Sequence, residues 1–221
     1  MTGHVPLLAD LVRRPSVNPM GRDVSGPEYL EARVTDFLVQ RFTALGLPWA
    51  RQPVSPGRDN VVVRLDATIP RAPVLLWDAH QDTVPGENMT IEPFVPVVQN
   101  GRMYGRGTCD VKGGMAAMVA AVEELLARSG PREATVVFSA TVNEEFGFSG
   151  ARALARLWEP ATPDAPVTDA AARKVVGRRP TLAIVAEPTG LDLVTQHKGA
   201  IRWRIRVHGR ACHSAFPEQG S

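Results

Sequence analysis

The sequence predicts an α/β fold, a three-layer sandwich built on a mixed, largely parallel sheet. Short runs that are apolar almost throughout alternate along the chain with amphipathic helical segments. The clearest apolar runs are residues 73–79 (PVLLWDA), 135–142 (TVVFSATV) and 182–186 (LAIVA). Strands without polar alternation are typical of a sheet covered on both faces, so we expect helices on each side of it.

Helices are predicted where apolar residues recur every three or four positions. Residues 27–45 fit this pattern, since Pro27 suits a first helical turn and Gly46 suits the stop that follows. Residues 111–128 form the most regular helical pattern, with Met115, Val119 and Val122 on one face. The remaining predicted elements are helices at 5–14 and 148–158, a strand at 60–65, a turn beside a short strand at 101–107, and an exposed insertion with at most one short helix at 159–180.

Composition excludes several classes of function. The 221 residues carry 25 basic and 23 acidic side chains without blocks of one sign, so no nucleic-acid partner is expected. No apolar run approaches the roughly 18 residues of a membrane helix, so no membrane partner is expected. The start of the chain lacks a signal-peptide pattern, and Cys109 and Cys212 are its only cysteines. Both observations favour a cytoplasmic location.

Reactive side chains collect where the predicted strands end and where the most regular helix begins. They are one imidazole and a group of carboxyl side chains: His80, Asp82, Asp110, Glu144, Glu145 and Glu187. Each alone has an ordinary structural explanation, such as a helix N-cap or a solvated turn. Together at one edge of a sheet, the carboxylates would repel one another unless protons or cations neutralise them. A metal cluster is therefore predicted, and histidine with carboxylates suits Zn²⁺, Co²⁺ or Mn²⁺.

Five segments carry a family resemblance. They are residues 80–85 (HQDTVP), 104–117 (YGRGTCDVKGGMAA), 143–151 (NEEFGFSGA), 186–189 (AEPT) and 209–221 (GRACHSAFPEQGS). In this order they resemble the dinuclear-zinc metallopeptidase and deacylase family of acetylornithine deacetylase, succinyl-diaminopimelate desuccinylase, aminoacylase and carboxypeptidase G. The resemblance implies a metal-dependent hydrolase that cleaves the amide bond of N-acyl amino acids or short peptides. It also implies a homodimer for the full-length protein.

The resemblance implies two divalent metal ions, zinc first, with cobalt and manganese as alternatives. The implied metal ligands are His80, Asp110, Glu145 and Glu187. His80 and Glu187 would bind the first ion and Glu145 the second, while Asp110 would bridge both.

Three further residues receive catalytic roles from the resemblance. Asp82 would hold the second ring nitrogen of His80. Glu144 would be the general base that takes a proton from a metal-bridging water. His213 would reach from a lid domain to the developing oxyanion.

A change of pattern after Pro188 marks the opening of a second domain. Residues 191–196 and 200–207 alternate apolar with polar side chains, which is typical of strands with one face in water. With the resemblance, this divides the chain into the N-terminal part of a metal-binding catalytic domain at 1–195 and the beginning of a lid or dimerisation domain at 196–221. So short a second domain has too little core to stand alone. We therefore expect a fragment that is inactive as it stands and lacks the family's further histidine ligand.

Two alternatives remain open at this point. Cys109 beside Asp110 and Cys212 beside His213 suggest a thiol protease, but neighbouring strand residues point to opposite faces and pair poorly. The other alternative is a non-catalytic binding or dimerisation relic of the same fold. Such a relic would be free to lose Glu144, whereas this chain retains it.

Overall fold

The computed structural model describes residues 3–160, 169–196, 198–199, 208–210 and 215–219. The chain divides into two compact units, Met1–Pro188 and Thr189–Ser221. Every α-helix and β-strand of the described residues lies in the first unit.

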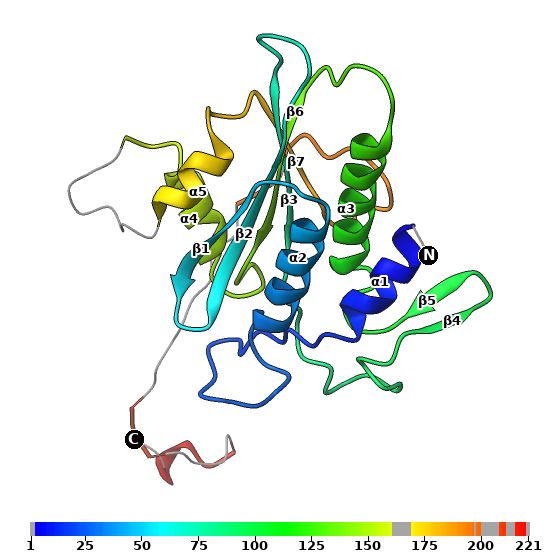
Figure 1. Cartoon of the computed structure of the whole chain (residues 1–221). Helices are drawn as coiled ribbons and strands as arrows, with labels where there is room; N and C mark the ends of the chain where they lie inside the picture. Colours follow the sequence, from blue (N-terminus) through cyan, green and yellow to red (C-terminus); the bar gives the residue numbers. More distant parts are fainter. Residues whose placement is uncertain (1–2, 161–168, 197, 200–207, 211–214, 220–221) are drawn as a thin grey trace. The chain divides into compact units, whose positions relative to one another are not determined.

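A five-stranded sheet forms the centre of the first unit (Figure 1). In spatial order its strands are β1 (Trp49–Ser55), β2 (Arg58–Leu65), β6 (Thr135–Thr141), β3 (Val74–His80) and β7 (Leu182–Val185). β2 pairs antiparallel with both β1 and β6, whereas β3 pairs parallel with both β6 and β7. The sheet is therefore mixed, as predicted, but it is not largely parallel. A separate hairpin consists of β4 (Val97–Gln99) and β5 (Arg102–Tyr104).

β1 is not predicted from the sequence, because polar residues interrupt its apolar pattern. Gln52 is 1% exposed, yet its side chain donates to the carbonyl of Ala153 at 2.8 Å. Its side-chain oxygen accepts from Asn60 Nδ2 at 2.9 Å. A buried amide with these partners is compatible with a strand interior, although its polarity hides the strand from a search for apolar runs.

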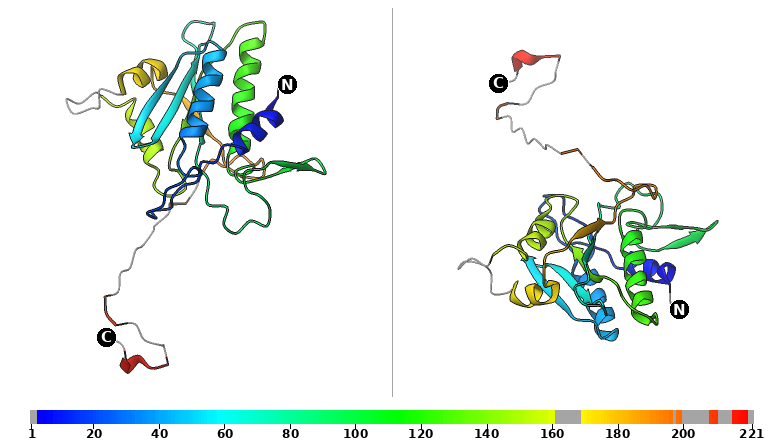
Figure 2. Two further views of the ribbon diagram at one scale, coloured as in Figure 1. Left: turned by 60° about the horizontal axis from the view of Figure 1, so that its bottom comes forward. Right: turned by 90° about the horizontal axis from the view of Figure 1, so that it is seen from above.

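Helices cover both faces of the sheet, as the sequence predicts (Figures 1 and 2). Val61 and Val63 of β2 pack in one apolar cluster with residues of three helices: α1 (His4–Val12), α2 (Ala32–Ala44) and α3 (Lys112–Ala127). Val62 points the other way, into a second cluster with α4 (Ser149–Arg156) and α5 (Asp169–Val176). This alternation follows from the two-residue period of a strand, and it places the core on both sides of β2.

Three predicted elements differ in detail. The helix predicted from Pro27 begins at Ala32, because Tyr29 pairs with Val17 in an isolated bridge before the helix starts. The region 159–180 is not merely an exposed insertion, since Ala172 and Val176 of α5 are fully buried against the sheet. The strand predicted as buried at 182–186 is an exposed edge strand, with Leu182 and Val185 both 59% exposed.

The described residues of the second unit form two local features. A turn at residues 189–192 is closed by the amide of Asp192, which donates to the carbonyl of Thr189 at 3.2 Å. A 3-10 helix spans Pro217–Gln219. The strand predicted at 191–196 is absent, so that prediction is wrong, and the one predicted at 200–207 lies outside the described residues. No helix in the described part of the chain is long and apolar enough to cross a bilayer.

Candidate metal centre

The predicted reactive residues meet at the carboxyl edge of the parallel strands. β3 ends at His80, which lies opposite Thr141, the last residue of β6. Glu187 follows the end of β7, and β7 runs parallel beside β3. Because parallel neighbours end at the same edge, the side chains that follow them are delivered to one place. Asp110 arrives there from the segment that leads into α3.

Three side chains converge closely enough to bind one metal ion. We call His80, Asp110 and Glu187 the His80 cluster, because their ligand atoms all lie within 4.8 Å of one another. His80 is 3% exposed, whereas both carboxyl groups are exposed. His80 Nε2 lies 3.0 Å from Asp110 Oδ1. The cluster therefore has a buried nitrogen ligand below and carboxylate ligands open to solvent.

The second ring nitrogen of His80 faces the main chain. Nδ1 lies 2.9 Å from the carbonyl oxygen of Asp82, but 3.7 Å from its carboxylate. A carbonyl can only accept, so this contact places the proton on Nδ1 in the neutral ring. Nε2 is then left to bind a metal ion, which is the usual arrangement for a metal-ligating histidine.

The carboxylate of Asp82 holds the turn that carries the two glutamates. It accepts from the main-chain amides of Glu144 and Glu145 at 3.1 and 3.2 Å. Asn18 Nδ2 donates to the same carboxylate at 2.7 Å. Asp82 is fully buried, and these three donors stabilise its charge. The predicted partner of His80 thus also fixes the predicted base.

Glu145, the predicted ligand of a second ion, lies beside the His80 cluster. Its Oε1 accepts from the amide of Val84 at 3.2 Å. Burial, together with the nearby charge of Asp110, raises the pKa of Glu145 to about 7. The pKa of Glu187 is raised by burial and by the charges of Glu144 and Asp110. Acids crowded in this way retain protons until a cation replaces them.

The pKa shifts of His80 and Asp110 favour the charged form of each side chain, whereas those of Glu145 and Glu187 favour the neutral form. Burial alone would lower the pKa of His80, but its hydrogen bond to Asp110 and the charges of Asp82 and Glu144 raise it to about 9. The same hydrogen bond lowers the pKa of Asp110. A proton therefore occupies the position between these two side chains that a metal ion would take.

The donor set fits a divalent cation. It combines one imidazole with several carboxylates, and this suits Zn²⁺, Co²⁺ or Mn²⁺. The excess of carboxyl groups over cationic partners supplies the negative charge that such an ion neutralises. His213, predicted to contact the oxyanion, lies outside the described residues.

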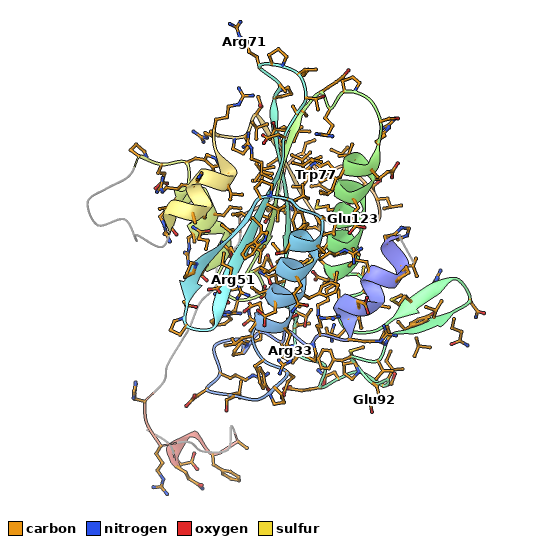
Figure 3. The ribbon with its side chains drawn as sticks, viewed as in Figure 1. Arg33, Arg51, Arg71, Trp77, Glu92 and Glu123 are labelled. Atoms are coloured by element: carbon orange, nitrogen blue, oxygen red, sulfur yellow. The ribbon has the colours of Figure 1, made fainter. Side chains whose placement is uncertain are left out.

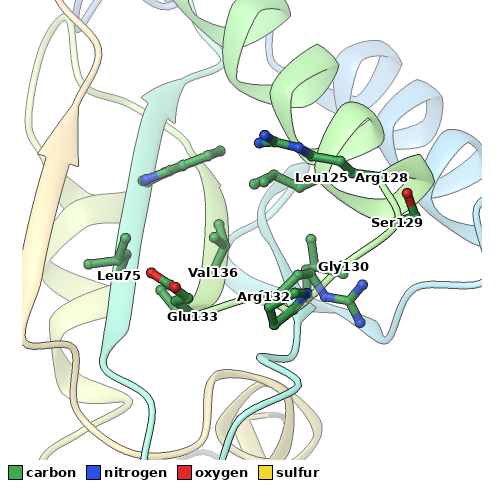
Figure 4. A pocket seen from close by; sticks show the side chains of 12 residues that line it. Leu75, Leu125, Arg128, Ser129, Gly130, Arg132, Glu133 and Val136 are labelled. Atoms are coloured by element: carbon green, nitrogen blue, oxygen red, sulfur yellow. The ribbon is translucent and has the colours of Figure 1, made fainter.

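A separate cavity of about 490 Å³ lies at the opposite ends of the strands (Figure 4). It is lined by Leu75 near the start of β3, Val136 near the start of β6, and Leu125 near the end of α3. None of the predicted site residues lines it. The cavity therefore has no part in the chemistry predicted at the carboxyl edge.

Fold and site together define an α/β protein with a candidate divalent-metal centre at the carboxyl ends of parallel strands. The sequence model of the family described as "Peptidase family M20/M25/M40" matches residues 76–210, which is more than half of the chain. The chain belongs to this family. The resemblance drawn from the five sequence segments is thereby confirmed.

Relatives by sequence carry names from the same family. A succinyl-diaminopimelate desuccinylase of Methylorubrum extorquens is 32% identical over 234 residues, covering 99% of this chain and 54% of the relative. A peptidase M20 domain-containing protein of Schizosaccharomyces pombe is 30% identical over 198 residues, covering 86% of this chain and 42% of the relative. The chain thus spans about half the length of the curated relatives it matches.

Solved structures support the same fold. A tripeptidase from Staphylococcus aureus matches with a TM-score of 0.55 at 26% identity, covering 69% of this chain and 39% of that one. Human carnosine dipeptidase 1 matches with a TM-score of 0.58 at 18% identity, covering 82% of this chain and 37% of that one. The second likeness concerns the fold alone.

Proposed function

We propose that the protein is a metal-dependent amidohydrolase acting on N-acyl amino acids or short peptides. The observation that carries the proposal is the His80 cluster, where an imidazole and two carboxyl groups converge within 4.8 Å at the carboxyl edge of the sheet. Family membership supports the same chemistry. Among the residues that the structure describes, no comparable cluster favours a thiol protease or a non-catalytic relic, and Cys212 and His213 lie outside them.

The described residues divide naturally between two ions. His80, Asp110 and Glu187 would hold the first ion, and Asp110 and Glu145 would contribute to the second. Asp110 suits the shared position because it contacts His80 directly and its charge also acts on Glu145. Divalent ions bound at these residues would polarise the scissile carbonyl group and lower the pKa of a water molecule.

Glu144 would act as the general base. Its carboxylate would accept a proton from the attacking water and later deliver that proton to the departing amine nitrogen. Support comes from the main-chain bond to Asp82 and from the charge of Glu144, which raises the pKa of both His80 and Glu187. The base is therefore anchored beside the cluster. Asp82 would keep His80 oriented, and His213 would donate to the oxyanion.

The names of two relatives support the proposed substrate class. The desuccinylase relative removes a succinyl group from a diamino acid by its name, and the tripeptidase acts on tripeptides by its name. Both names describe small substrates with an amide bond. We propose the same class of substrate for this protein.

The domain and cellular assignments complete the proposal. Residues 1–195 would form the N-terminal part of the metal-binding domain, and residues 196–221 would begin a lid or dimerisation domain. The protein would act as a homodimer in the cytoplasm, without a nucleic-acid or membrane partner.

The test is an amide-hydrolysis assay of the protein expressed from its complete reading frame. N-succinyl-diaminopimelate, N-acetyl amino acids and tripeptides would be supplied with Zn²⁺ or Co²⁺. We expect turnover of at least one substrate class, loss of turnover with a chelator, and recovery on adding metal. Glu124→Gln on the exposed side of α3 serves as the control for Glu144→Gln. Turnover that survives both the chelator and Glu144→Gln would contradict the proposal.

A further inference from the structure

A buried ion pair lies behind the turn that carries Glu144 and Glu145. Glu31, directly before α2, is 0% exposed, and Arg58, the first residue of β2, is 9% exposed. Arg58 Nη2 donates to Glu31 Oε1 at 2.6 Å, and Arg58 Nε donates to Glu31 Oε2 at 2.9 Å. A buried pair of this kind is weak as a stabilising element, because desolvation offsets most of the attraction. The other contacts of the Glu31–Arg58 pair therefore indicate its role better than its own attraction does.

Both members of the pair contact Asn143. Arg58 Nη1 donates to the side-chain oxygen of Asn143 at 2.9 Å. The main-chain amide of Asn143 donates to Glu31 Oε1 at 3.2 Å. The pair thus holds one residue by its side chain and by its backbone at the same time. Asn143 is the residue that immediately precedes Glu144.

Asn143 is where the chain turns from β6 into the acidic segment. Its φ is +60°, in the left-handed region that asparagine tolerates better than most residues. The side chain is fully engaged: its oxygen also accepts from Asn18 Nδ2 at 3.0 Å, and its nitrogen donates to Ser149 Oγ at 2.9 Å. These bonds determine the direction in which the following two glutamates leave the sheet.

A second attachment joins the same turn to the His80 segment. Asn18 Nδ2 bridges Asn143 to Asp82, whose carboxylate holds the amides of Glu144 and Glu145. We call Asn18, Glu31, Arg58, Asp82 and Asn143 the paired network. Through it, segments far apart in sequence are hydrogen-bonded to the turn that carries Glu144 and Glu145.

We propose that Arg58, together with Glu31, is a positioning residue that fixes the Glu144–Glu145 turn through Asn143. Arg58 acts through Asn143, and its side-chain hydrogen bonds are to Asn143 and Glu31. Bidentate binding requires the planar fork of arginine, so lysine is a poor replacement at this position. The importance of this position for catalysis rests on the proposed function, whereas the ordering of the turn does not.

The direct test is hydrogen exchange at the amides of Glu144 and Glu145 in the metal-free chain. Arg58→Gln should speed exchange at these two amides by about tenfold or more, while amides of α3 exchange as in the wild type. Arg51→Gln is the matched control, because Arg51 on the neighbouring strand pairs with Asp36 and Asp59 at 38% side-chain exposure (Figure 3). It should leave both sets of amides unchanged.

A second variant covers the case in which Arg58→Gln does not fold. Asn143→Gly keeps a residue that accepts positive φ, retains the Glu31–Arg58 pair, and removes the side-chain link between them and the turn. It should produce the same local acceleration. Wild-type exchange at Glu144 and Glu145 in a folded variant would overturn the proposal, and so would an equal acceleration throughout the chain.

The catalytic consequence is read separately in the protein from the complete reading frame. Arg58→Gln should lower kcat by roughly a hundredfold with little change in KM, since a base displaced by about 1 Å loses rate rather than binding. The double variant Arg58→Gln with Asn143→Gly should have a kcat no lower than that of the slower single variant, because both substitutions remove the same Arg58–Asn143 linkage. An additive loss would overturn the positioning role. Failure of Glu144→Gln to reduce turnover would instead sink the proposed function and leave the exchange result standing.

Discussion

Two ionic regions meet at the carboxyl edge of the sheet, and they differ in how their charges are balanced. In the paired network, Glu31 has the guanidinium of Arg58 and Asp82 has three N–H donors. In the His80 cluster and its neighbour Glu145, one imidazole faces several carboxyl groups, and burial with mutual repulsion raises the pKa of Glu145 to about 7. The first region is complete with protein groups alone. The second is balanced only by protons or by a cation.

This difference distinguishes a region that maintains the geometry, the paired network, from a region that would bind metal, the His80 cluster. A region with every donor and acceptor matched holds its geometry whether or not a ligand is bound. A region with surplus carboxylates changes its protonation when a metal ion arrives, so its state reports the ligand.

The largest effect is expected from Glu144→Gln. Glutamine cannot accept the proton of the attacking water, so kcat should fall by roughly a thousandfold, within the range for loss of a general base. Metal affinity should stay within about threefold of the wild type, since Glu144 is not a member of the His80 cluster. Steady-state kinetics and metal titration would check the two halves. A variant that lost metal and activity together would move Glu144 into the ligand set.

Glu187→Gln should act on metal binding itself. It removes one of the three ligand groups of the His80 cluster, so affinity for Zn²⁺ should fall by at least about a hundredfold, the effect expected of even a supporting group. Competition with a chromophoric chelator would measure the change, with Glu124→Gln as the control. Unchanged affinity would show that the cluster is only a set of neighbouring acids.

Metal affinity should also rise with pH. Because the pKa of His80 is raised to about 9, the imidazole is protonated at neutral pH and must lose that proton when a metal ion binds. Affinity should therefore increase by up to about tenfold for each unit between pH 7 and pH 9. Calorimetry in buffers of different ionisation enthalpy would count the released protons. A pH-independent affinity with no proton release would contradict this account of the cluster.

The smallest effect concerns the stability of the metal-free chain. A His80 pKa of about 9, above its ordinary 6.5, gives stability that is complete below pH 6.5 and is lost as pH rises towards 9. The pKa of Glu145 is raised from 4.5 to about 7, so its contribution to the stability of the fold is lost as the pH rises between these two values. Tm without metal should thus be lower at pH 9 than at pH 5, by on the order of 5 °C. Saturating Zn²⁺ should remove most of this difference, and a Tm that rises with pH in the metal-free chain would be the contrary result.

Much of the fold follows from apolar patterns in the sequence. The runs that become β3 and β6 are apolar over nearly their whole length, so both are predicted within a residue or two. β1 is hidden because Gln52 is buried with amide partners, and α5 is undervalued because its apolar residues fall within a stretch rich in alanine, proline and charge. Such elements depend on tertiary contacts that no local pattern records.

The residues of the candidate site likewise include some that the sequence predicts and some that it does not. The predicted ligands His80, Asp110 and Glu187 do converge, because two strand ends and the start of α3 place them at one edge. Asp82 was predicted, but its place in the paired network was not, since Arg58 and Glu31 are separated from Asn143 by at least 85 residues and have no motif of their own. A charged residue a few positions before an apolar run, as Arg58 is before β2 residues 61–63, is the one signal that could have drawn attention to it.

The most direct test of the metal centre is anomalous diffraction from crystals of the chain grown with Zn²⁺. We expect an anomalous peak about 2.0–2.1 Å from His80 Nε2, within bonding distance of carboxylate oxygens of Asp110 and Glu187. If both proteins are crystallised at one low Zn²⁺ concentration, we also expect the peak to disappear in the Glu187→Gln crystals. Well-ordered crystals with zinc bound elsewhere, and no peak beside His80, would contradict the central claim.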